Sequence, residues 1–289
     1  MLTLIPNNLN HMPKIILFCL LLLPHAHAQG SSDTKPDVGF TNLFNGKNFD
    51  GWYLKVKNDD DALAKRVFSA EAGNVHVFDD SFPDEIDLDA GINKTMGMMY
   101  TKKEYSKYHF KFEYKWGKRK ANYFKKWKYD AGVYFHVTDD KIFPTGIEYQ
   151  VMFDHTKNKN HTGDAIRPGG VKYDWYFSEE TLAYLHPDHG GQLHKTKLPG
   201  KRTWLHEAKP TKNFHALNNE WNSCEIIVMG KEYAIYKLNG EVVNMVFNLS
   251  PEKGIIGLQS ETAEIFYRNI QIKEFSETIP AEKFLKKKE

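Results

Sequence analysis

The chain has 289 residues, of which 41% are hydrophobic and 26% are charged, and 39 basic residues are nearly balanced by 37 acidic ones, giving a net charge of +2. The basic residues are spread along the chain, which argues against a nucleic-acid-binding protein. The length suits one large all-β domain or two small ones.

Residues 1–28 have the pattern of a cleavable secretory signal peptide. One charged residue, Lys14, precedes an apolar run from Ile15 to Leu23, and the small-x-small tripeptide Ala26-His27-Ala28 predicts cleavage before Gln29. A membrane span needs about 20 apolar residues, so this shorter run predicts no transmembrane segment in the mature protein. We therefore expect a secreted or periplasmic protein.

The rest of the chain predicts a β-sandwich. Residues 29–38 have little apolar content, which predicts a flexible lead-in. From Phe40 to Phe275, short β-branched and aromatic runs alternate with Gly, Asn, Asp and Pro, and Asn239-Gly240 predicts a two-residue hairpin turn. The predicted strands are Tyr108–Trp116, Gly132–Val137, Gly146–Phe153, Trp221–Met229, Glu232–Leu238, Glu241–Asn244, Gly254–Gln259 and Glu264–Phe275.

Some segments depart from the strand pattern. Lys118 to Tyr129 is crowded with lysines and aromatic residues, and Thr181 to His215 is rich in histidine, so we predict two long loops. Residues 276–289 end in three lysines and predict a basic, solvated tail. Cys224 is the only cysteine after the leader, so no intramolecular disulfide can form, and its strand-like surroundings predict an inert core thiol.

Three predicted strand segments carry polar side chains at every second position. Because alternate side chains of a strand share a face, Glu148 lies with Gln150, Tyr134 with His136, and Gln259 with Glu261. An ordinary strand with a solvated face has the same pattern. Glu and Gln are disfavoured in strands, however, and carboxylates and amides that converge in one groove suit sugar hydroxyls.

Several motifs, in order along the chain, resemble the 3-keto-disaccharide hydrolase family. The similarity runs from Gly39 to about Lys273 and implies a concanavalin-like jelly-roll sandwich of two antiparallel sheets, with the domain at residues 39–275. It also implies cleavage of glycosides whose sugar is oxidised to a ketone at C3. The motifs are Gly39-Phe40-x-x-Leu43-Phe44-Asn45-Gly46-Lys47-x-x-x-Gly51-Trp52, Gly146-Ile147-Glu148-Tyr149-Gln150, Glu220-Trp221-Asn222, Leu238-Asn239-Gly240, Gly257-Leu258-Gln259-Ser260-Glu261 and Phe266-x-Arg268-Asn269-Ile270.

The chemistry of such a substrate defines the groups that a site must supply. A ketone at C3 acidifies the hydrogen on C2, so a base can remove it, the C1 substituent leaves, and water can add to the unsaturated product. Glu148 is predicted as general base or metal ligand, with Glu261 as its partner carboxylate and Asp164 as a third catalytic candidate. The structural alternatives are an inward salt bridge from Glu148 to Arg268 and a turn-capping Asp164.

Further residues are predicted to bind the substrate. His136 could donate to the ketone oxygen, Gln150 and Gln259 could bind hydroxyl groups, and Trp52 could stack on a sugar. A structural histidine and a core tryptophan are the alternatives for His136 and Trp52. A divalent metal ion held by Glu148, His136 and Glu261 is also a candidate cofactor, whereas the spacing of the histidines between residues 186 and 215 fits no zinc motif.

Two other functions fit the same fold. A noncatalytic, lectin-like carbohydrate-binding module is the first, because fold alone does not determine function. The second is a conventional retaining glycosidase that uses Glu85-Ile86-Asp87-Leu88-Asp89, a segment similar to a laminarinase-type signature. That mechanism needs two carboxyl groups about 5 Å apart. All three hypotheses make a carbohydrate the expected partner, and protein partners stay unknown at this point.

Overall fold

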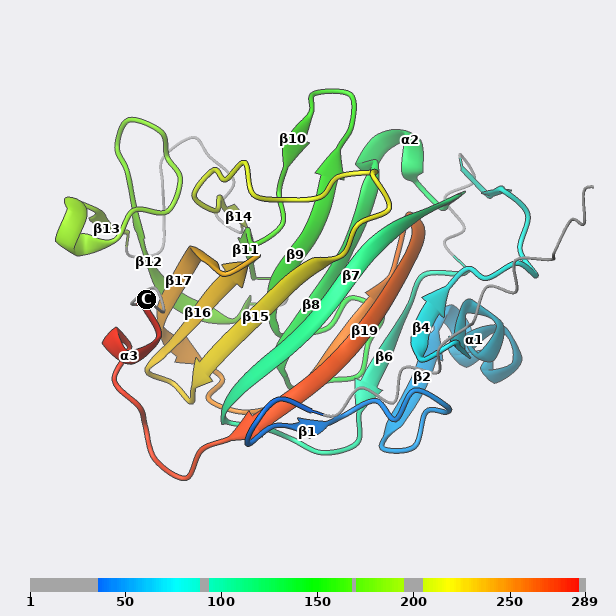
Figure 1. Ribbon diagram of the computed structural model, residues 1–289, viewed down its shortest axis with the longest axis horizontal. Helices are drawn as coiled ribbons and strands as arrows, with labels where there is room; N and C mark the ends of the chain where they lie inside the picture. The colour runs from blue at the N-terminus through cyan, green and yellow to red at the C-terminus, as the bar shows by residue number, and fades with distance from the viewer. Residues whose placement is uncertain (1–35, 89–93, 168–169, 195–204, 286–289) are drawn as a thin grey trace, which may run out of the picture. The chain divides into compact units, whose positions relative to one another are not determined.

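The strands form two facing sheets (Figure 1). The computed structural model describes residues 36–88, 94–167, 170–194 and 205–285. The predicted leader and the lysines at 286–288 lie outside these residues. The all-β sandwich of two antiparallel sheets is confirmed, with a single parallel pair, β5 with β7, in the described residues.

The first sheet, sheet A, has 11 strands in the described residues, in the order β13-β12-β17-β16-β15-β7-β19-β4-β3, with β1 against β19 and β5 against β7. Its strands are β1 (Thr41–Asn42), β3 (Phe68–Glu71), β4 (Asn74–Val77), β5 (Glu85–Ile86), β7 (Lys107–Ala121), β12 (Lys172–Phe177), β13 (Gln192–His194), β15 (Asn222–Met229), β16 (Tyr233–Leu238), β17 (Glu241–Ser250) and β19 (Ala263–Glu274).

The second sheet, sheet B, has eight strands in the same residues, in the order β14-β11-β9-β8-β18-β6-β2, with β10 against β9. Its strands are β2 (Trp52–Val56), β6 (Gly97–Thr101), β8 (Tyr129–Val137), β9 (Ile147–Asp154), β10 (Lys159–Asn160), β11 (Ala165–Ile166), β14 (Leu205–His206) and β18 (Ile255–Ser260). Each of the eight strands predicted from sequence is found, with ends within about two residues except at β7, β8 and β17, which are longer than predicted.

Three short α-helices connect or flank the sheets in the described residues. They are α1 (Asp61–Val67), α2 (Phe124–Trp127) and α3 (Glu282–Leu285), with 3-10 turns at Lys57–Asp59 and Pro187–His189. Asp60 caps α1 by accepting from the Leu63 amide at 2.9 Å. In the part of the chain that the structure describes, no helix is long and apolar enough to cross a membrane.

The main core lies between the sheets and is rich in aromatic side chains. Phe112 of sheet A meets Tyr149 of sheet B edge to face at 5.8 Å between ring centroids, and Tyr236 lies 5.0 Å from the same ring. Cys224 is fully buried there, and burial raises the pKa of its thiol, as the prediction of an inert thiol requires.

Two predicted loops differ from the structure. The Lys118–Tyr129 segment is wrong as a loop, because β7 continues to Ala121, α2 follows, and β8 begins at Tyr129. The Thr181–His215 segment contains the short strands β13 and β14, and its residues 195–204 lie outside the described part.

The segment after β19 also differs from the prediction. Phe284 and Leu285 of α3 pack against the core instead of extending into solvent, and the Tyr233 hydroxyl donates to the Ile279 carbonyl. Residues 276–285 therefore cover part of the outer face of sheet A.

Candidate active site

Three carboxyl groups, two of them buried and one half-buried, lie together on the outer face of sheet B. Glu148 lies on β9, Asp130 on β8, and Glu261 in the turn between β18 and β19. Burial and then the charge of Glu261 raise the pKa of Glu148 to about 8, and burial raises the pKa of Glu261 to about 7. Burial, Glu261 and Glu148, in that order, raise the pKa of Asp130 well above its usual value. The structure thus brings the two predicted glutamates together.

Strand alternation explains why these groups share a face. On β8, the side chains of Val133 and Phe135 enter the main core, whereas Tyr134 belongs to a second apolar cluster with Met98 and Tyr100. Tyr134 pairs directly with Glu148 of β9, so both side chains leave the sheet on the same side. The outer face of sheet B therefore carries the carboxyl groups beside an aromatic cluster.

Gly132 provides the space that the Glu148 carboxyl group occupies. A Cβ atom built at Gly132 would lie 2.2 Å from Glu148 Oε1 and 2.9 Å from its Cδ. Any other residue at this position would therefore push the carboxyl group away. The glycine in the middle of β8 allows the Glu148 side chain to lie across the strand.

Hydrogen bonds hold Asp130 in place. The Gln150 side-chain amide donates to Asp130 Oδ1 and, at 3.3 Å, to the Ala131 carbonyl. The Asp130 backbone amide donates to Thr262 Oγ1 at 2.8 Å, and the same hydroxyl donates to the Lys128 carbonyl at 2.5 Å. Gln150 thus lies at the predicted site, where its amide group orients Asp130.

Asn122 fixes the turn that carries Glu261. Its side-chain amide donates to the Glu261 backbone carbonyl, and its Oδ1 accepts from the Thr95 hydroxyl at 3.1 Å. Asn122 lies just after β7, in the segment predicted to be a long loop. The segment after β7 therefore holds in place the turn that carries Glu261.

Gln259 and Tyr134 complete the face. Gln259 is only 1% exposed, and its Oε1 has no hydrogen-bond partner among the described residues, so an acceptor is free at this position. Tyr134 interacts with Glu148 through a side-chain hydrogen bond, and burial raises the pKa of its phenol well above the usual value. Tyr134 is therefore a proton-bearing donor at neutral pH.

His136 does not share the face of Tyr134, so this part of the alternation prediction is wrong. A bulge interrupts the β8–β18 register here, and His136 has a φ of 50°. The fully buried ring lies 6.5 Å from that of Tyr108 in sheet A, and Nδ1 lies 2.9 Å from the Pro251 carbonyl oxygen. Burial lowers the pKa of His136 to about 4, as expected for a neutral core histidine.

Trp52 faces the core as well. Its indole is 3% exposed and donates to the Leu43 carbonyl at 2.7 Å. Its neighbours Tyr53 and Lys55 lie on the opposite face of β2, because Tyr53 pairs with Tyr100 and Lys55 with Met98. The structure therefore excludes sugar stacking on Trp52 and places Tyr53 on the outer face of sheet B instead.

The carboxylate of Asp164 has partners of its own. Oδ2 lies 2.9 Å from His161 Nδ1, and Oδ1 accepts from the Ala208 amide at 2.6 Å. The group is 3% exposed, and burial raises its pKa. These contacts join two loops, which favours the structural alternative for this residue.

The predicted metal site is not assembled. Glu148, Glu261 and His136 cannot meet at one ion, because His136 points between the sheets. Among the described residues, no group of three or more His, Cys, Asp or Glu side chains is arranged to hold a metal ion. The residues present therefore do not fit the proposed divalent ion, and we derive no step through one.

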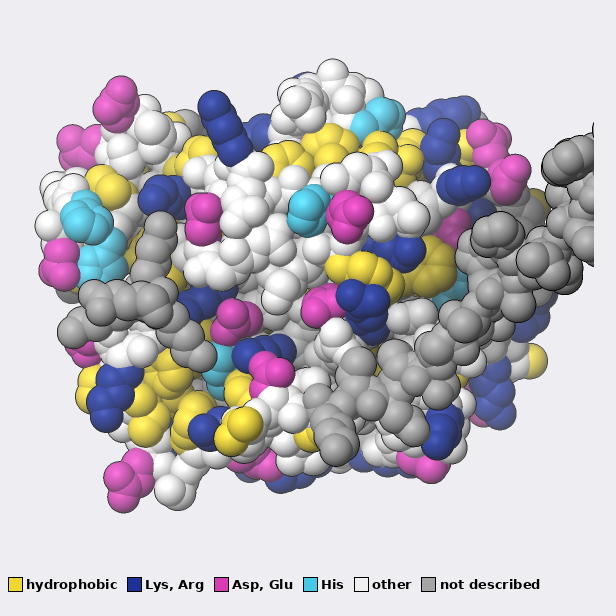
Figure 2. Space-filling model, viewed as in Figure 1, with side chains coloured by type: hydrophobic (Ala, Val, Ile, Leu, Met, Phe, Trp, Pro, Cys, Tyr) yellow, Lys and Arg dark blue, Asp and Glu magenta, His cyan; other side chains and the backbone are white. Residues whose placement is uncertain are grey.

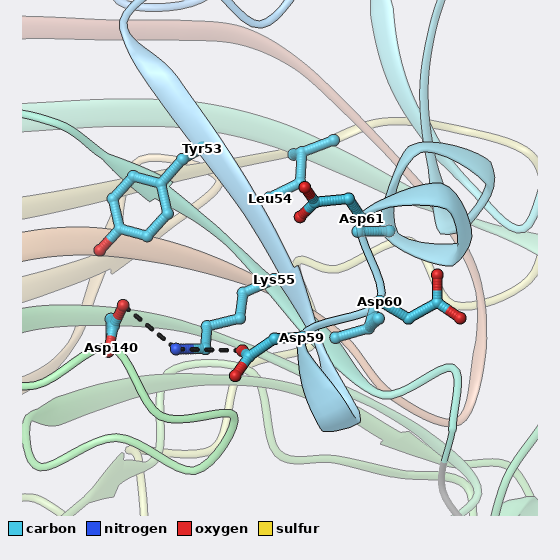
Figure 3. Close-up of a pocket in the computed structure, with 9 residues that line it drawn as sticks. Tyr53, Leu54, Lys55, Asp59, Asp60, Asp61 and Asp140 are labelled. Atoms are coloured by element: carbon cyan, nitrogen blue, oxygen red, sulfur yellow. Dashed lines mark ion pairs between the residues drawn. The ribbon is translucent and has the colours of Figure 1, made fainter.

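A small pocket of about 180 Å³ lies at the β2 edge of sheet B (Figure 3). Lys55 crosses it, with Nζ 3.3 Å from Asp59 Oδ1 and 3.2 Å from Asp140 Oδ2. Tyr100, on the neighbouring strand, donates its hydroxyl to the Lys141 carbonyl at 2.6 Å. The loop that contains Asp140 and Lys141 thus folds over this part of the sheet, between the pocket and the carboxyl cluster.

The alternative glycosidase segment lies in the other sheet. Glu85 and Ile86 form β5, which pairs with Lys120 and Ala121 at the end of β7. Glu85 is exposed, Asp87 has a φ of 49°, and Asp89 lies outside the described residues. Nothing in the described part of this segment pairs two buried carboxyl groups.

Known protein families include one whose model matches most of this chain. The family model for the 3-keto-alpha-glucoside-1,2-lyase-like domain matches residues 39–273. No curated protein matches the chain. A Parabacteroides distasonis structure provisionally described as a glycosyl hydrolase is 20% identical and covers 83% of this chain and 95% of that chain, with a TM-score of 0.48.

Two further solved structures are similar to the chain. A second Parabacteroides distasonis protein, described in the same way, is 18% identical over 82% of this chain and 99% of that chain, with a TM-score of 0.48. A carbohydrate binding module from Bacillus subtilis is 10% identical over 62% of this chain and 82% of that chain, with a TM-score of 0.38.

The family match covers both sheets and all three carboxyl groups of the candidate site. It supports a carbohydrate-active enzyme of the glycoside hydrolase type. The resemblance predicted from the ordered sequence motifs is confirmed: the chain belongs to the family of the 3-keto-alpha-glucoside-1,2-lyase-like domain.

Proposed function

We propose that the chain cleaves 3-keto-glycosides by removing the proton at C2 and releasing the substituent at C1. The observation that carries the proposal is the gathering of Asp130, Glu148 and Glu261 on one face of sheet B, with the pKa of each raised. Perturbed titratable groups that cluster at one place are typical of catalytic sites. The family match supports the choice of substrate class.

The elimination needs a base and an acid at neutral pH. The base takes the C2 proton, the electron pair moves through the enolate to expel the C1 oxygen, and an acid protonates that oxygen. Like charges held together in a buried site cannot all ionise, so the cluster retains protons near pH 7. Glu148 and Glu261 therefore form an acid–base pair in which one group is ionised while the other is protonated.

Two neighbouring residues supply the remaining contacts. The Tyr134 hydroxyl is the donor that would stabilise the developing enolate oxygen, in place of His136, which the structure turns into the core. The unpartnered Oε1 of Gln259 would accept from a sugar hydroxyl. Water addition to the unsaturated sugar would complete hydrolysis; without it the enzyme is a lyase.

The test uses purified protein with methyl 3-keto-α-glucoside, and methyl α-glucoside as the unoxidised control. We expect release of methanol together with an unsaturated sugar or free 3-keto-glucose, from the oxidised substrate alone. Equal cleavage of both substrates would favour a conventional glycosidase, and binding of both without turnover would favour the lectin-like module. A parallel assay with a chelator tests dependence on a divalent ion.

We also propose that the protein is exported. The support is the residue pattern of the first 28 positions, which lie outside the described residues. Expression of the full chain in a bacterial host, followed by mass spectrometry of the mature N-terminus, tests this. A mature protein that begins at Gln29 would agree with export, and an intact leader would contradict it.

A further inference from the structure

A large cavity of about 840 Å³ opens on the outer face of sheet A. Its floor consists of side chains from β12, β16 and β17, and its walls come from residues 184–189 and from α3. Pockets for small ligands in proteins usually measure about 300 to 1,000 Å³. We call it the β17 cavity; the residues that matter here are Tyr176, Tyr184, Asp188, Lys209, Glu241 and Phe247.

The β17 cavity lies on the other side of the sandwich from the candidate active site. Along β12, Tyr173, Trp175 and Phe177 enter the core, so Tyr176 points outward from sheet A. The carboxyl groups of the active site lie on the outer face of sheet B. A ligand in the β17 cavity therefore leaves the proposed site for 3-keto-glycosides free.

The cavity presents aromatic surface. The rings of Tyr176 and Phe247 meet edge to face, with 5.2 Å between their centroids, and both lie on neighbouring strands of the floor. Aromatic rings are large contact surfaces for the apolar faces of a ligand. Glu241, which also lines the cavity, accepts a hydrogen bond from the Thr211 hydroxyl at 2.9 Å, so its carboxylate is held in place.

The charges around the cavity have both signs. Lys209 and Lys237 line it together with Asp188, Glu241 and Glu282. The space-filling view agrees, since basic and acidic side chains are intermixed over this face and histidines gather at the edge where Figure 1 places β13 (Figure 2). A balanced lining of this kind suits a neutral ligand that both donates and accepts hydrogen bonds better than a strongly charged one.

Tyr184 adds an unsatisfied polar group to the lining. Its side chain is 5% exposed, and its hydroxyl has no hydrogen-bond partner among the described residues. A buried hydroxyl without a partner costs free energy, which a ligand hydroxyl could recover. Burial and the charge of Asp188 raise its pKa, so the hydroxyl keeps its proton.

We propose that the β17 cavity is a second carbohydrate site, which binds a neutral oligosaccharide without cleaving it. Aromatic surface, charged groups of both signs and an unpartnered tyrosine hydroxyl suit sugar rings with many hydroxyl groups. The inference goes beyond the proposed catalytic function and does not depend on turnover. Its place on the opposite sheet would let the enzyme hold a glycan while the active site acts on a separate substrate.

Isothermal titration of the full chain with maltose tests the proposal. We expect saturable binding that weakens about tenfold in Tyr176→Ala, which loses an aromatic contact, and about threefold to tenfold in Tyr184→Phe, which loses a hydroxyl. Phe143, an aromatic side chain that is 54% exposed and does not line the cavity, provides the matched control variant Phe143→Ala. Its affinity should equal that of the wild type.

The catalytic readout separates this inference from the proposed function. Tyr176→Ala should turn over methyl 3-keto-α-glucoside at the wild-type rate, and Glu148→Ala should keep its affinity for maltose. Absence of saturable binding to the wild type would overturn the second site. So would unchanged affinity in both tyrosine variants, or loss of affinity in Glu148→Ala. If the protein cleaves no 3-keto-glycoside at all, the maltose titration still shows whether the β17 cavity binds a carbohydrate.

Discussion

The Gly132→Ala variant tests the geometry of the candidate active site most directly. The new Cβ atom would lie 2.2 Å from Glu148 Oε1, whereas a non-bonded contact needs more than 3 Å. The carboxyl group must therefore move by about 1 Å, and a displacement of this size can cost about 10²-fold in rate. We expect kcat for a 3-keto-glucoside to fall by about this factor, although no protein group that exchanges protons is removed.

The same clash should appear in stability. Forcing an extra methyl group into a packed site costs about 1–3 kcal/mol. In a Glu148→Ala background the clashing carboxyl group is absent, so Gly132→Ala should then cost close to nothing. Denaturant unfolding of the four proteins in this cycle measures the coupling free energy, and it needs no substrate.

Gly97→Ala is the matched control. Its Cβ atom would lie 2.4 Å from the Lys55 carbonyl oxygen and 2.8 Å from Val56 Cγ1, so it strains the same sheet without touching Glu148 or Tyr134. We expect it to lower the free energy of unfolding and to leave kcat near that of the wild type. Equal loss of kcat in both glycine variants, or an equal stability cost of Gly132→Ala with and without Glu148, would refute the reasoning.

Three further predictions concern the carboxyl groups. Glu148→Gln and Glu261→Gln should each lower kcat by about 10²–10⁴-fold. A substrate with a nitrophenyl leaving group needs no acid, so it should restore turnover only in the variant that lacks the acid. Rescue of both variants or of neither would contradict the acid–base pair. The pKa is about 8 for Glu148 and about 7 for Glu261 in the folded protein, whereas a glutamate in an unfolded chain has a pKa of about 4.3. The folded state therefore binds more protons than the unfolded state from about pH 4.5 to 8. The free energy of unfolding should therefore fall as pH rises, by about 1 kcal/mol per pH unit per carboxyl group, and each glutamine variant should show a smaller slope in denaturant titrations. Glu85→Gln should keep full activity, since Glu85 is exposed in the other sheet; lost activity in this variant would revive the retaining glycosidase.

The strands could be predicted from sequence because each combines a run of β-branched and aromatic residues with clear turn residues. Asn239 and Gly240 both adopt positive φ, as their tight hairpin requires. The Lys118–Tyr129 segment was mispredicted because its lysines conceal alternation: β7 continues through it to Ala121. Packing in the folded protein overrides composition there.

The candidate site could be predicted only in part. Alternation placed Glu148 and Gln150 on one face correctly, because β9 is regular there. The alternation rule gives the wrong face for His136, because a bulge reverses the direction of this side chain. The local sequence contains no residue that predicts the bulge. Asp130 was missed because the predicted strand began at Gly132. If the predicted strand is extended by two residues toward its start, the same alternation places Asp130 on the face of Tyr134.

The stability cost of the carboxyl cluster supports a catalytic role. Burial without full compensation destabilises ionised carboxylates, so a purely structural site would pair each group with a cation. Glu264 shows that arrangement elsewhere in this protein: His76, Arg119 and two backbone amides surround it, and its pKa is lowered. Glu148 instead faces Glu261 and has its pKa raised. The fold therefore stabilises the ionised form of Glu264, whereas it leaves Glu148 with a pKa near neutral pH, where it can exchange a proton.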